Sequence, residues 1–328
     1  MDYVRLGQSG LMVSRIGLGA MGFGDKTWRE WVLNKDDSHK IVRRALDKGI
    51  NFFDTCDYYS AGASEVILGQ TLLRDVNRHE IVLSTKVGMN MGGDPNARGF
   101  SRKHLFHAVD QSLKRLGTDH IDLYQTHIWE PTANIDEMMD AFDTLITSGK
   151  VLYVGATDMP AWQFSEAIHY AKRTGRAPFV SMQNHYNLLF REHERELLPL
   201  CRANGIGLIP YSPMGRGFLA GNRTKEGWGE TIRAKSDDFA QNVFFRDVDF
   251  EITNKTMAIA GKHGVKSVQI ALAWVLQQEG IAAPIFGATD SDHVDDAVSA
   301  LEIQLENSDM IELEASYESR PLPTRKSS

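Results

Sequence analysis

The feature that most restricts the fold of this 328-residue chain is a regular alternation of short apolar runs with segments of helical apolar spacing. Eight of the apolar runs have the length of strands, and they recur at intervals of roughly 30 to 40 residues. Such alternation favours a parallel sheet in which a helix follows each strand. The predicted strands are residues 14–19, 51–54, 81–86, 121–127, 151–156, 179–183, 207–211 and 281–286.

Helical segments lie between these strands. Eight strand and helix units predict the fold class α/β, specifically a (β/α)8 TIM barrel. A doubly wound open sheet is the alternative, but the early GLGAMGFG matches its dinucleotide fingerprint only loosely and lacks an acidic partner at the proper distance. The predicted helices are residues 36–48, 64–73, 101–116, 135–148, 161–174, 192–203, 251–263, 267–278 and 291–301, with a long polar loop before residue 249.

The length fits one barrel domain over residues 1–328, of which residues 316–328 are predicted to be a flexible tail. The net charge of −7 argues against nucleic acid or anionic membrane as a partner. No apolar run reaches the roughly 18 residues of a membrane span, so we expect a cytoplasmic protein. Cys56 and Cys201 are far apart and form no CxxC motif, which predicts buried cysteines with no disulfide and no metal site.

Polar residues stand where predicted strands end, which is where barrel enzymes carry their chemistry. Asp54 ends the second strand, Lys86 the third and His127 the fourth, and Tyr59 follows Asp54 in the same loop. A phenol with an ordinary pKa near ~10 is a weak acid catalyst at neutral pH, so a lysine held by a carboxylate would serve to lower that pKa. Taken singly, His127 could be a core histidine, and Asp54 and Lys86 a structural ion pair.

The same residues carry a resemblance to the aldo-keto reductases. FFDTCDYYSAGASEVILG, STKVG and DLYQTHIWE resemble the catalytic segments of that family, and VGATDM, SMQNHYNLLFRE and IPYSPMGRGFLAG resemble its cofactor segments in the same order. The similarity runs from residue 3 to about residue 315. The WREWVL insertion and the block SMQNHYNLLFREHERELLPLC look like the YajO-like bacterial branch.

This resemblance implies a metal-free, reversible hydride transfer between NAD(P)H and an aldehyde or ketone. Tyr59 would be the proton donor, with Tyr58 as the alternative; Lys86 with Asp54 would lower the pKa of the phenol, and His127 would orient the substrate oxygen. Two other functions stay open. One is a barrel aldolase that uses Lys86 to form a Schiff base, and the other is a nicotinamide-sensing binding subunit.

The resemblance also implies a set of cofactor contacts, beginning with the nicotinamide carboxamide and ring and ending at the adenosine. Asp290 stands at a position that is basic in near relatives, so NADP(H) is expected as the main cofactor with NAD(H) as an alternative. Arg233, Lys225 or Lys235 could restore the missing positive charge from the long loop. The implied contacts are Thr157, Asp158, Gln183, Tyr211, Ser212, Met214, Gly217, Gly287, Thr289, Asp290 and His293.

Aromatic residues in loops expected at the open end of the barrel predict an apolar substrate pocket. Phe23, Trp31, Met89 and Trp129 are the predicted lining residues, and Trp28 and Phe100 lie in the same segments. Such a pocket favours bulky aldehydes and ketones over phosphorylated sugars, because no arginine pair is positioned for a phosphate. The predicted partner is therefore a small-molecule carbonyl compound, and the sequence predicts no particular oligomeric state.

Overall fold

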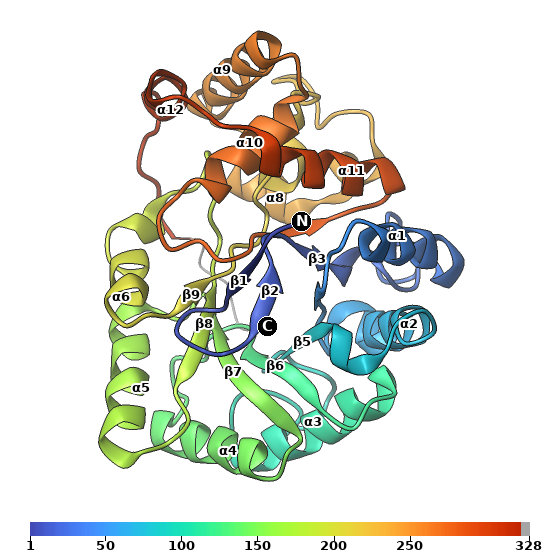
Figure 1. Cartoon of the computed structure of the whole chain (residues 1–328), viewed down its shortest axis with the longest axis vertical. Coiled ribbons are helices and arrows are strands. Elements are labelled where there is room, and N and C mark those ends of the chain that lie inside the picture. The colour runs from blue at the N-terminus through green and yellow to red at the C-terminus, as the bar shows by residue number, and fades with distance from the viewer. Residues whose placement is uncertain (323–328) are drawn as a thin grey trace.

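Eight parallel strands form the centre of the molecule, in a computed structural model that describes residues 1–322 (Figure 1). Their order is β10-β3-β4-β5-β6-β7-β8-β9, and parallel bridges join Leu208 to Ile281 and Tyr211 to Ile285 beside β9 and β10. These bridges close the sheet, so the predicted (β/α)8 barrel is confirmed. The strands are β3 (Gly17–Gly19), β4 (Phe52–Asp54), β5 (Val82–Val87), β6 (Ile121–Thr126), β7 (Val151–Thr157), β8 (Phe179–Gln183), β9 (Gly207–Leu208) and β10 (Ile285–Gly287).

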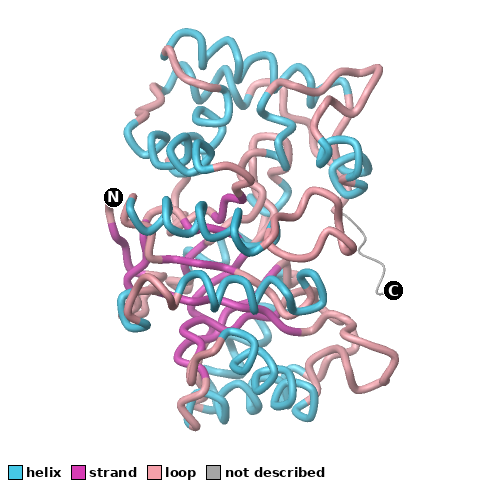
Figure 2. The backbone as a smooth tube through the Cα atoms, turned by 90° about the vertical axis from the view of Figure 1, so that its right-hand side faces the viewer, coloured by secondary structure: helices cyan, strands magenta, loops and turns pink. Residues whose placement is uncertain are grey.

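Helices lie outside the strands on both sides (Figure 2). Every residue of β5 and β6 is buried, as expected for parallel strands that have helices outside and a packed barrel interior inside. The outer helices are α1 (Lys35–Asp47), α2 (Ala63–Leu72), α3 (Arg102–Leu116), α4 (Ile135–Thr147), α5 (Ala161–Thr174), α6 (Leu197–Ala203), α9 (Asp247–His263), α10 (Ser267–Leu276) and α11 (Ser291–Ser299).

An N-terminal hairpin that the sequence did not predict crosses one end of the barrel (Figure 1). It pairs β1 (Tyr3–Arg5) with β2 (Met12–Ser14) in antiparallel fashion. Leu6 and Val13 from this hairpin pack in one apolar cluster with the barrel residues Phe52 and Leu123. The hairpin therefore covers the amino-terminal ends of the strands and leaves the carboxyl ends for chemistry.

Arg15 joins the first part of the chain to the last strand. Its guanidinium donates to the carbonyl oxygens of Leu276 at 2.8 Å, Ile281 at 2.6 Å and Ala282 at 2.7 Å. Five N–H donors on a rigid plane suit this task, because several carbonyls can be bonded at once. The residue thus fixes the entry to β3 against the end of α10 and the approach to β10.

Two local predictions differ from the structure. The stretch predicted as a long polar loop contains the 3-10 helix η5 (Gly215–Ala220) and the short helices α7 (Ile232–Ser236) and α8 (Asp238–Val243). Helix α2 begins at Ala63, one residue before the predicted start, and Gly62 is its N-cap with φ of 91°. The Ser64 hydroxyl donates to the carbonyl of Ala20 at 2.7 Å, which ties α2 to the loop after β3.

The chain after helix α12 (Asn307–Glu314) is tied down, where the sequence predicts a flexible tail from residue 316. Tyr317 donates its hydroxyl to Glu192 at 2.7 Å, and the buried Arg320 pairs with the buried Asp249 of α9. Specific partners more than 70 residues away anchor this segment. The rest of the predicted tail, residues 323–328, lies outside the described residues.

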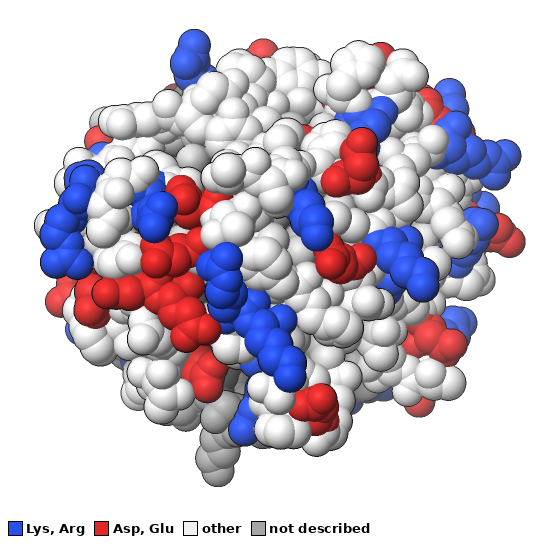
Figure 3. Space-filling view, turned by 90° about the horizontal axis from the view of Figure 1, so that it is seen from below, with Lys and Arg blue, Asp and Glu red and all other residues white. Residues whose placement is uncertain are grey.

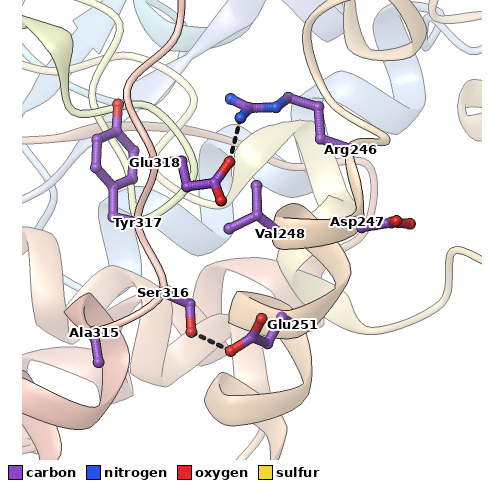
Figure 4. Close-up of a pocket in the computed structure, with 8 residues that line it drawn as sticks. All are labelled: Arg246, Asp247, Val248, Glu251, Ala315, Ser316, Tyr317 and Glu318. Atoms are coloured by element: carbon purple, nitrogen blue, oxygen red, sulfur yellow. Dashed lines mark hydrogen bonds and ion pairs between the residues drawn. The ribbon is translucent and has the colours of Figure 1, made fainter.

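A pocket of about 460 Å³ lies between the start of α9 and the segment after α12 (Figure 4). Arg246 pairs with Glu318 across it at 2.6 Å, and Ser316 donates to Glu251. None of the predicted site residues lines this pocket. It is lined by Arg246, Asp247, Val248, Glu251, Ala315, Ser316, Tyr317 and Glu318.

Charged side chains of both signs are interspersed on the face drawn in Figure 3. This face therefore provides no broad field of one sign for a polyanion. Within residues 1–322, no helix is both long enough and apolar enough to cross a bilayer.

Candidate active site

The four residues predicted to carry the chemistry lie together at the carboxyl ends of three neighbouring strands. Asp54 ends β4, Lys86 lies near the end of β5, His127 follows β6, and Tyr59 begins the 3-10 helix η2 (Tyr59–Gly62). Lys86 Nζ donates to Asp54 Oδ2 at 2.5 Å and to the Thr55 carbonyl at 2.8 Å. The same Nζ lies 5.2 Å from the centre of the Tyr59 ring, and the His127 ring meets the Tyr59 ring edge-on at 5.6 Å.

Asp54 is held by more partners than the sequence predicts. Its Oδ1 accepts hydrogen bonds from Ser84 Oγ at 3.0 Å, Gln125 Nε2 at 3.1 Å and Gln183 Nε2 at 3.1 Å. All three partners are buried inside the barrel. Sequence reasoning missed Ser84 and Gln125, although polar residues inside apolar strands are the signal that could have found them. Gln183, predicted to face the cofactor carboxamide, uses its side-chain NH₂ group to donate a hydrogen bond to Asp54.

Lys86 is a buried cation that stays charged. Burial opposes the charged form, but the neighbouring Asp54 carboxylate raises the pKa of Lys86 above its ordinary value. An ammonium that is always protonated and bonded to two oxygens is a poor nucleophile. This geometry argues against the aldolase alternative, which needs Lys86 as a free amine.

Tyr59 keeps its proton, which differs from the expectation that Lys86 lowers the pKa of the phenol below its ordinary value. Burial raises the pKa of Tyr59 to about 12, and the Lys86 charge opposes this rise without cancelling it. The phenol is therefore fully protonated at neutral pH. The Lys86 charge lowers the free-energy cost of forming the tyrosinate, but the phenol remains neutral until the proton is transferred.

The turn that carries Tyr59 has a strained backbone. Ser60 and Ala61 have φ of 50° and 51°, in the left-handed region that residues with a side chain seldom enter. The Ser60 hydroxyl accepts from the amide of Asp25 at 3.2 Å, which links this turn to the loop after β3. That loop brings Trp28 to Tyr59, with ring centres 6.2 Å apart.

The neighbours of Tyr59 in the turn have different surroundings. Tyr58 is partly exposed, as Tyr59 is, and it meets Trp28 edge-on at 6.4 Å. Cys56, predicted as a buried cysteine without a role, is indeed buried, but its Sγ lies 2.9 Å from His127 Nδ1. A contact of that kind between a loop and another strand depends on register, so the sequence alone could not reveal it.

Asp158 and Tyr211, both predicted at the nicotinamide, bond to each other. The Tyr211 hydroxyl donates to Asp158 Oδ2 at 2.7 Å, and Asp158 Oδ1 accepts from the backbone amide of His185 at 3.0 Å. Asp158 has φ of 44°, a conformation that aspartate tolerates better than most residues. The Tyr211 ring lies nearly parallel to the His185 ring at 5.1 Å, so its plane is fixed from one side.

The segment predicted at the pyrophosphate is a turn of unusual backbone. Ser212, Arg216 and Gly217 have φ of 54°, 54° and 87°, and the partly buried Met214 packs against the core. Left-handed turns of this kind expose backbone amides that bind anions. Arg216 itself pairs with the buried Asp237 at 2.8 Å, so its side chain serves the loop.

At the predicted adenosine end, Asp290 caps helix α11, a role that the sequence reasoning did not give it. Its Oδ1 accepts from the amide of Asp292 at 2.9 Å, and the Thr289 amide donates to His293 Nδ1 at 3.3 Å. Gly287 ends β10 just before this cap, with open space where a side chain would be.

Two of the three loop cations that the sequence offered for this end have other partners. Arg233 lies 4.4 Å above the Trp31 ring and pairs with Asp237 at 3.2 Å. Lys225 pairs with Asp247 at 2.5 Å. The negative charge at the start of α11 is therefore not offset by either of these two residues.

The predicted pocket residues divide between core and rim. Phe23 is fully buried in the main apolar core and exposes no surface in this structure, so its predicted place in a substrate pocket stays a prediction. Trp129 stacks on Phe100 at 5.7 Å, and Trp31 is covered by Arg233. Met89 is half-buried in the loop after β5.

Known proteins with a similar sequence cover nearly the whole chain. A versiconal hemiacetal acetate reductase of Aspergillus parasiticus is 37% identical over 97% of each chain. A putative aryl-alcohol dehydrogenase of Schizosaccharomyces pombe is 38% identical over 96% of this chain and 95% of its own. A putative aryl-alcohol dehydrogenase of Saccharomyces cerevisiae is 35% identical over 96% of each chain.

These relatives are fungal, so the predicted assignment to a bacterial branch is not supported. The family model, named Aldo/keto reductase family, matches residues 15–318, which include the whole barrel and all four clustered residues. The chain therefore belongs to the aldo/keto reductase family, and it is an oxidoreductase that carries out NAD(P)H-dependent carbonyl reduction.

Proposed function

We propose that Tyr59 is the proton donor of this reductase and that Asp54, Lys86 and His127 act on it and on the substrate oxygen. The observation that carries the proposal is the buried ion pair of Lys86 and Asp54, 2.5 Å long and next to the Tyr59 ring. A cation held beside a phenol stabilises the tyrosinate that forms when the proton leaves. In the reverse direction the same tyrosinate would accept the proton of an alcohol.

When bound, the reduced nicotinamide supplies the hydride to the carbonyl carbon. The Tyr59 hydroxyl gives its proton to the carbonyl oxygen, which becomes the hydroxyl of the product. His127 donates a hydrogen bond to the same oxygen and limits the charge that builds up there. Lys86 balances the tyrosinate until solvent returns a proton to it, and Asp54 holds the ammonium in place.

Two features support a nicotinamide dinucleotide on the cofactor side. The buried Thr157 Oγ1 has no hydrogen-bond partner among the described residues, although it lies at the end of β7 beside Gln183. A buried hydroxyl of this kind is suited to a carboxamide. The left-handed turn at Ser212, Arg216 and Gly217 is suited to the negative pyrophosphate.

For the cofactor itself we propose NADP(H) as the main partner, with weak discrimination against NAD(H). The family resemblance supports the first part. The second part rests on the exposed Asp290 and on Asp292 in the first turn of α11, which would repel a 2′-phosphate. Arg233 and Lys225, which could offset them, are paired elsewhere.

For the substrate we propose bulky aromatic aldehydes and ketones. Trp28 lies 6.2 Å from Tyr59 and provides a flat apolar wall beside the proton donor. The names of the relatives point the same way, since two of them are putative aryl-alcohol dehydrogenases.

The experiment is a panel of carbonyl compounds assayed with both reduced cofactors. We expect repeated turnover with aryl aldehydes, slower reduction of small aliphatic aldehydes, and little reduction of phosphorylated sugars. A single turnover per protein molecule with every substrate would favour a nicotinamide-sensing role. Covalent trapping of a carbonyl compound on Lys86 by borohydride would contradict the proposal.

A further inference from the structure

Cys56 is a buried group that contacts the proposed machinery without a role in it. Its Sγ lies 2.9 Å from His127 Nδ1, and the Tyr58 backbone amide donates to the sulfur at 3.3 Å. The sulfur is also 3.3 Å from Asp57 Oδ1 and 3.8 Å from the Lys86 carbonyl. Of the three acceptors within reach of its proton, His127 Nδ1 is the nearest.

The sulfur carries a proton under ordinary conditions. Burial and the neighbouring Asp57 raise the pKa of the Cys56 thiol well above its ordinary value, so the thiolate does not form. A thiol has a single proton to donate. The amide of Tyr58 already occupies an acceptor direction of the sulfur, which leaves the S–H free to turn toward the imidazole.

Whether Nδ1 of His127 carries a proton determines whether Nε2 can donate a hydrogen bond. A neutral imidazole has one proton, so an Nδ1 that accepts from the thiol requires that Nε2 carry the proton. Nε2 is then a hydrogen-bond donor on a ring that meets the Tyr59 ring edge-on, with ring centres 5.6 Å apart, and the proposed reduction needs a donor on that ring. The opposite tautomer would present a bare nitrogen to the carbonyl oxygen and would repel it.

We propose that Cys56 is a positioning residue that fixes His127 in the tautomer with Nε2–H, through a hydrogen bond from its thiol to Nδ1. The inference rests on the proposed role of His127 as a donor to the substrate oxygen. Hydrogen bonds to the far nitrogen of a histidine set its tautomer and ring orientation in other catalytic sites, and their loss reduces activity.

The first test reads the tautomer directly. Long-range ¹H–¹⁵N correlation spectra of the whole protein with labelled histidine distinguish the two neutral forms, and a His127→Gln variant assigns the His127 signals. We expect the Nε2–H form in the native protein and a mixture of tautomers in Cys56→Ala. An Nδ1–H form in the native protein would overturn the inference, whatever the kinetics of the variants.

The second test reads activity in two backgrounds. We expect Cys56→Ala to lower kcat for carbonyl reduction by about 10-fold, with cofactor affinity changed by less than about 2-fold, while Cys56→Ser retains most of the activity. In a His127→Gln background, Cys56→Ala should have no further effect, because the two residues act as a unit. Equal losses in both backgrounds would show a packing role and overturn the proposal.

Cys201 provides the matched control, because it is also buried but lies in α6. Cys201→Ala should leave kcat and the His127 signals unchanged. The outcomes are separable from those of the proposed function. If the protein reduces carbonyl compounds and Cys56→Ala is as active as the native protein, this inference alone fails; if nothing is reduced, the proposed function fails while the tautomer remains measurable.

Discussion

Asp54 and Asp290 are the same residue type near the ends of two barrel strands, yet the structure uses them in opposite ways. Asp54 is 3% exposed and accepts bonds from Lys86, Ser84, Gln125 and Gln183. Asp290 is exposed and caps its own helix through the amide of Asp292. A buried charge is costly without its partners, whereas an exposed one is screened by water. In the proposed function, the chemistry therefore depends on a fixed set of buried side chains, and the proposed cofactor preference depends on surface charge that can change at low cost.

The largest effect should come from removing the proton donor. We expect Tyr59→Phe to lower the rate of carbonyl reduction by about 10³-fold with cofactor affinity nearly unchanged, since only the hydroxyl is lost. Single-turnover kinetics with the reduced cofactor measure this. Tyr58→Phe is the matched control and should keep most of the activity; the reverse result would make Tyr58 the acid.

The next effect should come from breaking the buried pair. Asp54→Asn leaves the Lys86 ammonium without its counter-charge, so we expect a free energy of unfolding lower by about 3 to 5 kcal/mol and an activity lower by about 10²-fold. Asp295→Asn is the control in α11, the helix that Asp290 caps, because the Asp295 carboxylate pairs with the partly exposed Arg44 and Lys48. It should cost less than about 1 kcal/mol. If denaturant titrations showed the same loss of unfolding free energy for Asp54→Asn and Asp295→Asn, the contrast between the buried Asp54 site and the exposed start of α11 would be contradicted.

A smaller effect is expected at Asp290. Asp290→Ser removes the charge and keeps a residue that can cap α11, so NADPH affinity should rise by about 5-fold while NADH affinity stays the same. Dissociation constants for both reduced cofactors measure the change. An equal gain for both cofactors would mean that Asp290 acts on helix stability and not on the 2′-phosphate.

The smallest effect should be that of pH on reduction. Because burial raises the pKa of Tyr59 to about 12, the donor stays protonated, and we expect kcat to vary by less than about 2-fold between about pH 6 and about pH 9. A decline centred near neutral pH would mean that Lys86 lowers the phenol pKa after all. Burial also raises the pKa of Asp57 to about 7, so such a decline counts against Tyr59 only if Asp57→Asn retains it.

Much of this molecule could be predicted from its sequence because the βα alternation is strongly periodic. The bounds of α5 and β8 match the predictions residue for residue, and the carboxyl ends of β4, β5 and β6 bring Asp54, Lys86 and His127 together as expected. Motif spacing also gave the family correctly. These features depend on order along the chain, which the sequence contains.

The rest depends on contacts between distant segments. Ser84 and Gln125 join the site because their strands are in a particular register, and Cys56 reaches His127 across 71 residues. The contact of Arg320 with Asp249 likewise spans 71 residues. Composition alone does not reveal this contact, and the tail was therefore predicted to be flexible. The rise in the Tyr59 pKa was missed because burial could not be weighed against the Lys86 charge without coordinates.

The bonds of Arg15 have a consequence for how the chain folds. They join residue 15 to carbonyls 261 to 267 residues later, and β3 pairs with β10 across a similar separation. Until residues 276 to 287 are available, one edge of β3 has no strand beside it. Closure of the barrel by pairing β3 with β10 is expected to be a slow step in folding, because most of the chain between these strands must be ordered before they can pair. During synthesis the nascent protein would therefore have an open sheet edge, and the last strand would convert it into a closed ring.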